Sequence, residues 1–542
     1  MTARRVCRIN EAVQAPRAIL DFVKRYRYWL AVWLPLAVWY AYPLWAARVV
    51  PLHDLPNHLA RITALHYLHD PRWNLSPFYE RSLQLVPYFA HYYVVHLLTY
   101  ITRSVSVANL LFMSAYILLT PLAGFSFARA TGRSPWLALL LLPLSVSIYF
   151  QWGFIAFCCG VMLMLPAMAA LYRVLDAPTL RGAIVVALWT AALYLFQIVP
   201  WAAFGAYAIL LLAIELACRR WRGPLYAATA MAPSLVMLAI GLEQARAFGY
   251  FGQGTPGENR YQALNDAPGK LLSRALNMIN WFQSENADEW VAIGLMLILL
   301  LLVISDGGSR THAETGEDPW RRRVRIPVAF VAFLGMAFAT PFWVKHPFNW
   351  WMINQRFLLP AACVACFFPR GPIRGARLAL VGAAVATMII LPRDMARQYR
   401  DFSKRAWPLI ELIRMTPMGS NTLVLHEPGR SFEDPALAPQ VTYWRELYNY
   451  PLVYRGGFDP YLYDDGFPIR RIASLPAPKV PRAAESLFTP EEARFNPATM
   501  MRGWDYFIVP EEARDVMPPD GAVRVRDAGS WTLYRNLSRT EH

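Results

Sequence analysis

The sequence has few charged residues and few cysteines, and both shortages exclude classes of protein. Only 17% of its 542 residues are charged, and six are cysteines. The cysteines fall in the basic N-terminal segment, within apolar runs or at their ends, so the disulfide framework of a small secreted domain is not visible. Cys363 and Cys366 have zinc-like spacing without a second pair, and we interpret them as one turn of a buried helix.

Two further patterns are missing from the chain. The glycines of Gly252-Gln-Gly254 and Gly456-Gly457 do not form a phosphate-binding loop, and no internal repeat or low-complexity tract occurs. The lack of a nucleotide site argues against an enzyme that uses a nucleotide sugar.

Apolar residues dominate what is present. With 56% hydrophobic residues and a mean hydropathy of +0.26, the chain carries more apolar side chain than a soluble core of this size could bury. The net charge of +16 then indicates basic cytoplasmic loops rather than a nucleic-acid partner. Apolar runs of membrane length, or close to it, lie near residues 28–48, 106–128, 135–150, 152–172, 181–198, 200–217, 225–243, 290–305, 326–343, 357–369 and 376–392.

Loop charge orients these runs. Residues 1–27 form a basic tail, and the following run lacks a small-residue cleavage site, so we interpret it as a retained signal anchor. If the segment at 86–102 does not cross the membrane, every predicted cytoplasmic loop is basic; if it crosses, later loops flip or another span must be dropped. We therefore predict about eleven spans within residues 28–393, a cytoplasmic N-terminus and a first periplasmic loop at 49–105 built from juxtamembrane helices.

The C-terminal part differs in composition. Residues 394–542 are charged and rich in proline, contain no apolar run of spanning length, and show short strand candidates at 422–426, 506–509, 523–525 and 531–534. The predicted fold class is therefore an all-α polytopic membrane protein with a C-terminal periplasmic α/β domain.

The best indication of chemistry follows the first apolar run, in Pro51-Leu-His-Asp-Leu-Pro-Asn-His-Leu-Ala-Arg61. If a helix begins after Asp54, then Asn57, His58 and Arg61 lie three, four and seven positions later, on one face. A carboxylate, an imidazole and a guanidinium would then converge at the membrane surface. The alternative is that Asp54 only caps the helix and that Arg61 reaches a lipid phosphate.

The order of these features resembles the GT-C superfamily of polyprenyl-phosphate-sugar glycosyltransferases. In such proteins an early Asp follows the first transmembrane helix, a juxtamembrane segment comes next, and a C-terminal outer domain ends the chain. Asn354-Gln355-Arg356-Phe-Leu-Leu-Pro360 is similar to the Arg-Tyr-Leu-Leu-Pro that these enzymes often carry before a late span. Many members pair the first Asp with an adjacent acidic residue, whereas Asp54 lies between His53 and Leu55.

A second likeness is to bacterial membrane proteins of the same general shape that have no assigned activity. Its residues are Asp-x-Pro-Asn-His-Leu-Ala-Arg, beginning at Asp54, with Trp152-Gly-Phe154 later in the chain.

The resemblance implies a protein of the bacterial inner membrane that transfers a sugar from a polyprenyl-phosphate donor to a periplasmic glycan, lipid or protein. Asp54 would be the base, and His58, Arg61 and Arg356 would bind the donor phosphate. We expect membrane lipids as partners, and neither a cofactor nor a bound metal. A divalent metal held by His53, Asp54 and His58 is the less favoured alternative, because Mg²⁺ and Mn²⁺ prefer a shell of oxygen ligands.

Two functions other than sugar transfer remain open. A transporter or flippase for a lipid-linked glycan would need ionisable side chains near the bilayer midplane, and an assembly protein would not need Asp54.

His91 and His96 do not share a helix face and are interpreted as interfacial polar residues rather than a ligand pair. Gln151 and Trp152 are interpreted as a tight outer turn with an aromatic membrane anchor.

Overall fold

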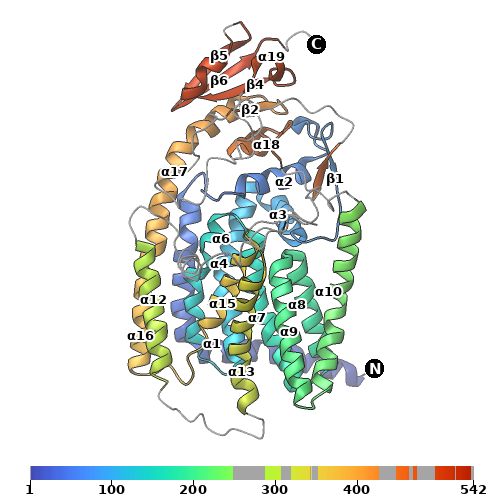
Figure 1. Cartoon of the computed structure of the whole chain (residues 1–542), viewed down its shortest axis with the longest axis vertical. Helices are drawn as coiled ribbons and strands as arrows, with labels where there is room; N and C mark the ends of the chain where they lie inside the picture. Colours follow the sequence, from blue (N-terminus) through green and yellow to red (C-terminus); the bar gives the residue numbers. More distant parts are fainter. Residues whose placement is uncertain are drawn as a thin grey trace.

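The computed structural model describes residues 2–247, 287–306, 319–341, 344, 352–425, 447–462, 468–472, 495–518 and 520–538. Its long helices lie side by side in one body, and a small sheet near the C-terminus occupies one end (Figure 1). Helix α1 (Thr2–Ala46) bends at Tyr26, and the part before the bend lies across the other end of the body. The predicted combination of a helical body with a small C-terminal sheet is confirmed.

The helical body contains elements of membrane-spanning length. Five helical segments in the described residues are long and apolar enough to cross a bilayer, namely Val105–Ala130, Ile155–Asp176, Ile198–Ala217, Arg222–Gln244 and Ala376–Met415. Shorter apolar helices cover Pro135–Ser145, Leu180–Phe196 and Trp290–Ile304. The elements are α4 (Val105–Ala130), α7 (Ile155–Asp176), α8 (Leu180–Phe196), α9 (Ile198–Ala217), α10 (Arg222–Ala247), α12 (Ala287–Ile304), α13 (Pro319–Ala339), α16 (Ala376–Met388) and α17 (Ile390–Met415).

Two of the predicted apolar runs contain only short helical segments. The run at 135–150 is divided into η2 (Pro135–Leu140), α5 (Leu141–Ser145) and α6 (Ile148–Gln151), and almost all of its side chains are buried. The run at 357–369 holds α15 (Leu358–Ala365), which follows the single turn α14 (Ile353–Arg356) and spans only about 12 Å. A broken helix is tolerated at membrane depth when it is buried in protein, because neighbouring groups supply hydrogen bonds to its free backbone N–H and C=O groups. Hydropathy of the sequence alone therefore does not distinguish such a segment from a membrane-spanning helix.

The segment at 49–105, predicted as the first periplasmic loop and called the first outer loop below, carries short helices. It contains α2 (Leu55–Tyr67), η1 (Pro71–Trp73), β1 (Tyr79–Arg81) and α3 (Phe89–Thr102). Helix α3 has 14 residues and is about 21 Å long, which is less than the roughly 30 Å of a bilayer core. It packs against α2, α4 and α8, so the segment at 86–102 forms part of the layer above the long helices.

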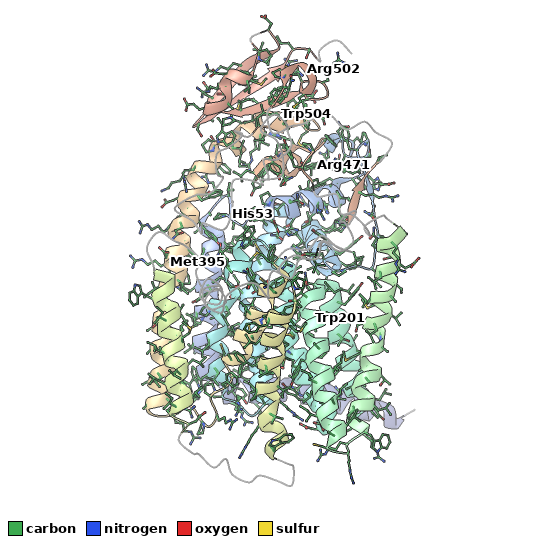
Figure 2. The ribbon with its side chains drawn as sticks, in the orientation of Figure 1. His53, Trp201, Met395, Arg471, Arg502 and Trp504 are labelled. Atoms are coloured by element: carbon green, nitrogen blue, oxygen red, sulfur yellow. The ribbon has the colours of Figure 1, made fainter. Side chains whose placement is uncertain are left out.

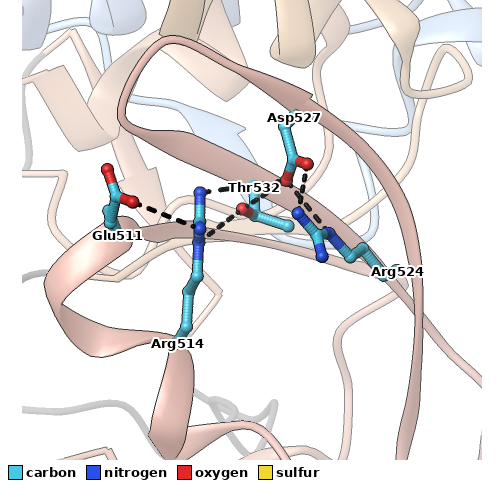
Figure 3. Close-up of polar contacts among 5 residues, drawn as sticks. All are labelled: Glu511, Arg514, Arg524, Asp527 and Thr532. Atoms are coloured by element: carbon cyan, nitrogen blue, oxygen red, sulfur yellow. Dashed lines mark hydrogen bonds and ion pairs between the residues drawn. The ribbon is translucent and has the colours of Figure 1, made fainter.

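The C-terminal sheet contains the four predicted strands. They are β2 (Thr422–Val424), β4 (Tyr506–Pro510), β5 (Ala522–Ala528) and β6 (Trp531–Asn536), arranged in the order β2-β4-β6-β5. Strand β2 is parallel to β4, and the other pairs are antiparallel. On the edge strand β5, Asp527 accepts hydrogen bonds from Arg524 of the same strand and from Thr532, and Arg514 donates to Thr532 and Glu511 (Figure 3). These charges and a register shift between Arg524 and Arg526 protect the exposed edge from pairing with another strand.

The same region joins the first outer loop through strand pairing and further hydrogen bonds. Strand β3 (Ile469–Arg471) pairs antiparallel with β1, and Gly457 N donates to Trp73 O at 2.8 Å. Asn74 Nδ2 donates to Gly419 O at 3.0 Å. The other short elements here are η4 (Leu447–Asn449), α18 (Tyr450–Arg455), α19 (Pro497–Met500) and η5 (Glu511–Val516). We call residues 447–538, where described, together with residues 419–425, which contain β2, the C-terminal unit; it is attached to the loop that carries α2.

Candidate active site

Two backbone hydrogen bonds fix the position of Asp54. His53 N donates to Gln151 O at 3.0 Å, and Asp54 N donates to Trp152 O at 3.1 Å. The start of the first outer loop is therefore bound to the turn between α6 and α7. His53 lies between the long helices and the C-terminal sheet (Figure 2), which places Asp54, its neighbour in the chain, at the same level.

Gly153 makes this close approach possible. Its φ of +81° is a conformation that residues with a side chain rarely adopt. A Cβ at this position would lie 2.8 Å from Asp54 N and 3.0 Å from Asp54 Cβ. Glycine is thus required both by the backbone conformation and by the space that Asp54 occupies.

The Asp54 carboxylate does not cap α2. Asp54 stands at the N-cap position, but its side chain makes no capping hydrogen bond to the helix, whose first turn contains Pro56. The side chain is 17% exposed, and Asp54 Oδ1 lies 3.7 Å from His53 Nε2. The capping interpretation of this carboxylate is therefore wrong, and the group retains access to solvent at the start of the helix.

His58 is buried one turn further along α2. Its Nδ1 lies 2.9 Å from the Tyr92 hydroxyl, and the ring also forms a hydrogen bond with the backbone of Gly153. Burial, followed by the charges of His91 and Arg61, holds the pKa of His58 well below its usual value. His58 is therefore neutral at physiological pH, and its hydrogen bonds support the turn that holds Asp54.

His91 was not predicted to take part in this arrangement. The sequence suggested an interfacial polar residue, but His91 is fully buried, its ring centroid lies 5.4 Å from that of His58, and its Nε2 lies 3.2 Å from Asn109 Oδ1. Burial lowers the pKa of His91 to about 4. The interfacial interpretation failed because a five-residue spacing cannot show which face of α3 meets α2.

The orientation of Arg61 is set by Asn57, which lies one turn earlier in the same helix. Its Nε donates to Asn57 Oδ1 at 3.1 Å, and only 3% of Arg61 is exposed. Asn57 Nδ2 in turn donates to Tyr461 O at 3.4 Å, across 404 positions of sequence. Because Arg61 lies inside the protein, the proposed contact of its side chain with a surface lipid phosphate is wrong.

Arg356 approaches the Trp152–Phe154 turn from a distant part of the chain. It ends α14, and its guanidinium carbon lies 4.1 Å from the ring centroid of Phe154 and 5.8 Å from that of Phe157. Arg356 is 7% exposed, makes no ion pair with any residue in the described ranges, and its Nε has no hydrogen-bond partner there. A buried guanidinium that has no counter-charge among the described residues is suited to binding an anion.

Trp152 belongs to the site rather than to the membrane surface. Its ring lies edge-on to His53 with centroids 4.7 Å apart, and it is buried, whereas an anchor would be exposed to lipid. The amide of Gln151 accepts a hydrogen bond from the Tyr399 hydroxyl at 2.9 Å. The prediction of an interfacial anchor is therefore wrong.

The four predicted site residues lie around the Trp152–Phe154 turn. Asp54 contacts the turn through its backbone, Arg356 stacks on the ring that follows Gly153, and His58 bonds to Gly153 itself. Arg61 lies close enough to His58 for its charge to affect the pKa of that ring. Gly153 and Asn57 have roles that the sequence did not reveal, although the Trp-Gly-Phe and Pro-Asn-His motifs contain them.

The structure does not assemble the alternative metal site. In the part of the chain that is described, no group of three or more His, Cys, Asp or Glu side chains is placed to hold a metal ion. His58 also uses its ring in bonds to Tyr92 and Gly153. The described residues therefore provide no His53, Asp54 and His58 ligand set.

Comparison with known proteins identifies the fold. No protein-family model and no curated protein matches the sequence. The crystal structure of ArnT from Cupriavidus metallidurans bound to undecaprenyl phosphate is similar with a TM-score of 0.55 and 10% identity, covering 94% of this chain and 98% of ArnT. A cryo-EM structure of the arabinofuranosyltransferase AftD from Mycobacteria covers 94% of this chain and 41% of AftD, with 13% identity and a TM-score of 0.48 that is too low to support an argument. The likeness to ArnT confirms the predicted fold class.

Proposed function

We propose that this protein is an integral membrane glycosyltransferase that moves a sugar from a polyprenyl-phosphate donor to a periplasmic glycan, lipid or protein. The observation that carries the proposal is the buried Arg356, which lacks a counter-charge among the described residues and stacks on the turn that holds Asp54. The neighbour ArnT has been crystallised with undecaprenyl phosphate, which supports a lipid phosphate as the anion.

The side chains fit the chemistry of this transfer. A carboxylate such as Asp54 can accept the proton of an acceptor hydroxyl as that oxygen forms its bond to the anomeric carbon and the donor phosphate leaves. Arg356 and Arg61 would stabilise the negative charge that develops on the phosphate. His58 could add a neutral hydrogen bond only by giving up one to Tyr92 or Gly153, so its first role is to support the Asp54 turn.

The distribution of charge favours an enzyme over a transporter. In helices α4, α7, α8, α9, α10, α12 and α16, the acidic and basic side chains within the described ranges lie at or near helix ends, as Asp176 does in α7 and Glu215 in α9. Arg325, near the start of α13, is buried in an ion pair with Asp176. Transporters place ionisable groups near the bilayer midplane, where substrate and coupling ions bind.

Replacing Asp54 with Asn tests the proposal. Because the carboxylate makes no capping hydrogen bond, Asp54→Asn should leave expression and the thermal unfolding midpoint nearly unchanged. Sugar transfer should fall by roughly 10²-fold or more through loss of the general base. Arg356→Lys should also lower activity, because lysine keeps the charge but loses the planar, two-pronged contact with phosphate.

The assay is complementation of the glycan phenotype in a deletion strain, together with transfer by the purified protein. Asp70→Asn is the matched control, since Asp70 lies on the same outer loop and its side chain accepts hydrogen bonds from Arg72. Full rescue by Asp54→Asn would remove this residue from the mechanism and favour the transporter or assembly functions.

A further inference from the structure

The side chain of Asn57 connects two parts of the molecule that are distant in sequence. Its Oδ1 accepts the hydrogen bond from Arg61 Nε at 3.1 Å, and its Nδ2 donates to Tyr461 O of the C-terminal unit at 3.4 Å. Asn57 is 1% exposed, so water does not compete for these bonds. We propose that the C-terminal unit, acting through Asn57, sets the orientation of Arg61 and so controls the affinity for the donor phosphate; this inference rests on the function proposed above.

The two bonds fix the orientation of the amide group. If the amide were flipped, its NH₂ would face the N–H of Arg61 and its oxygen would face the carbonyl of Tyr461. Both contacts would be repulsive. The carbonyl of Tyr461 therefore selects the one orientation in which Asn57 can accept from Arg61.

The turn that carries Tyr461 is itself rigidly held. Tyr461 N donates to Asp459 Oδ1 at 2.9 Å, and Asn449 Nδ2 donates to Asp459 Oδ2 at 2.7 Å. Arg471, labelled in Figure 2, donates to Pro460 O at 2.6 Å. Because these groups are buried or half-buried, the position of the Tyr461 carbonyl is a property of the whole folded unit rather than of a mobile loop.

The first outer loop contributes to the same turn. The Tyr79 hydroxyl accepts from Asp459 N at 2.8 Å and donates to Asp459 O at 3.2 Å. Tyr79 also begins β1, which pairs with β3. Docking of the C-terminal unit on the outer loop thus determines where the Tyr461 carbonyl meets Asn57.

Fixing Arg61 Nε defines the plane of its guanidinium group. A planar guanidinium recognises phosphate through two parallel N–H bonds, so a rotated plane weakens binding even though the charge remains. Asn57 is accordingly a positioning residue, and its loss should affect donor binding more than the stability of the fold.

The experiment measures binding of undecaprenyl phosphate to the purified full-length protein, alongside the thermal unfolding midpoint. Asn57→Asp keeps an oxygen for Arg61 but places a carboxylate oxygen against the Tyr461 carbonyl, and Asn57→Leu removes both bonds while keeping a side chain that branches at Cγ. Each should raise the Kd for undecaprenyl phosphate by about 10-fold or more, the usual effect of losing a buried hydrogen bond to a charged group. If Asn57→Gln binds undecaprenyl phosphate more tightly than Asn57→Leu does, this result would further support positioning.

Asn74→Gly is the matched control. Asn74 makes the same kind of side-chain bond to the C-terminal unit, at Gly419 O, and its positive φ is readily adopted by glycine. This variant should bind undecaprenyl phosphate as the wild type does, because it does not contact Arg61.

The possible outcomes separate this inference from the proposed function. Wild-type affinity in both Asn57 variants, or an equal loss of affinity in Asn74→Gly, would overturn the role of Asn57. If Asn57→Leu does not fold, Asn57→Asp alone decides by the same criterion. Absence of undecaprenyl phosphate binding by the wild-type protein would overturn the proposed function as well.

Discussion

Gly153→Ala should impair catalysis through the position of Asp54 without changing any ionisable group. An alanine Cβ would lie 2.8 Å from Asp54 N, where nonbonded carbon and nitrogen atoms normally remain about 3.4 Å or more apart. The two segments must therefore separate by about half an ångström, which also weakens the 3.1 Å bond from Asp54 N to Trp152 O. We expect about a 10-fold loss of kcat, since a misplacement of about 1 Å can lower a rate by about 10²-fold.

Backbone strain accompanies this displacement and needs its own control. An alanine in the left-handed region destabilises a fold by about 1–2 kcal/mol. Gly132, with φ +67°, has a similar conformation, but a Cβ there would have no neighbour within 4 Å. Gly132→Ala therefore reproduces the strain without moving the site.

The assay compares transfer kinetics and thermal unfolding for the two variants in the purified full-length protein. Both should unfold at lower temperature than the wild type, and only Gly153→Ala should lose kcat. Wild-type kcat in Gly153→Ala, or an equal loss in Gly132→Ala, would refute the dependence of catalysis on the Asp54–Gly153 contact.

Two other expectations concern pH and topology. His91 has a folded-state pKa of about 4 against 6.5 in the unfolded chain, so the unfolded state binds more protons between these values and stability falls as pH decreases from about 6.5 to 4, by up to about 3 kcal/mol. The unfolding midpoint of His91→Gln should fall less between pH 7.5 and 5 than that of the wild type, and parallel curves would contradict the assignment. For topology, exposed cysteines introduced at His69 and Arg374 should differ in reaction with an impermeant thiol reagent in intact cells, the first labelled and the second protected. Equal labelling would show the loop-charge orientation to be wrong.

The sequence predicts the parts of the site that depend on local spacing. Asp54, His58 and Arg61 could be placed together because helical periodicity is readable over seven residues, and Arg356 could be added from a motif at the start of an apolar run. The strands of the C-terminal sheet were predictable for the same reason, since alternation within a few residues marks them.

The contacts that complete the site are not local. Asn57 and Tyr461 are separated by 404 positions, and no periodicity relates them. The positive φ of Gly153 results from the turn that meets Asp54, and a single Gly between two aromatic residues does not show this. The buried state of His91 likewise depends on which face of α3 meets α2 and α4, which is a matter of tertiary packing.

Helix α2 is held in place by contacts with two different parts of the protein, and the loss of each contact should have a different kinetic effect. Its N-terminal end is bound to the helical body through Trp152 and Gly153, whereas the face that carries Arg61 is bound to the C-terminal unit through Asn57. A change at Gly153 should therefore act first on the base and lower kcat, while a change at Asn57 should act first on the phosphate contact and weaken donor binding. If both variants altered the same kinetic parameter, the division of α2 into a base end and a phosphate face would be wrong, even if each residue proved important.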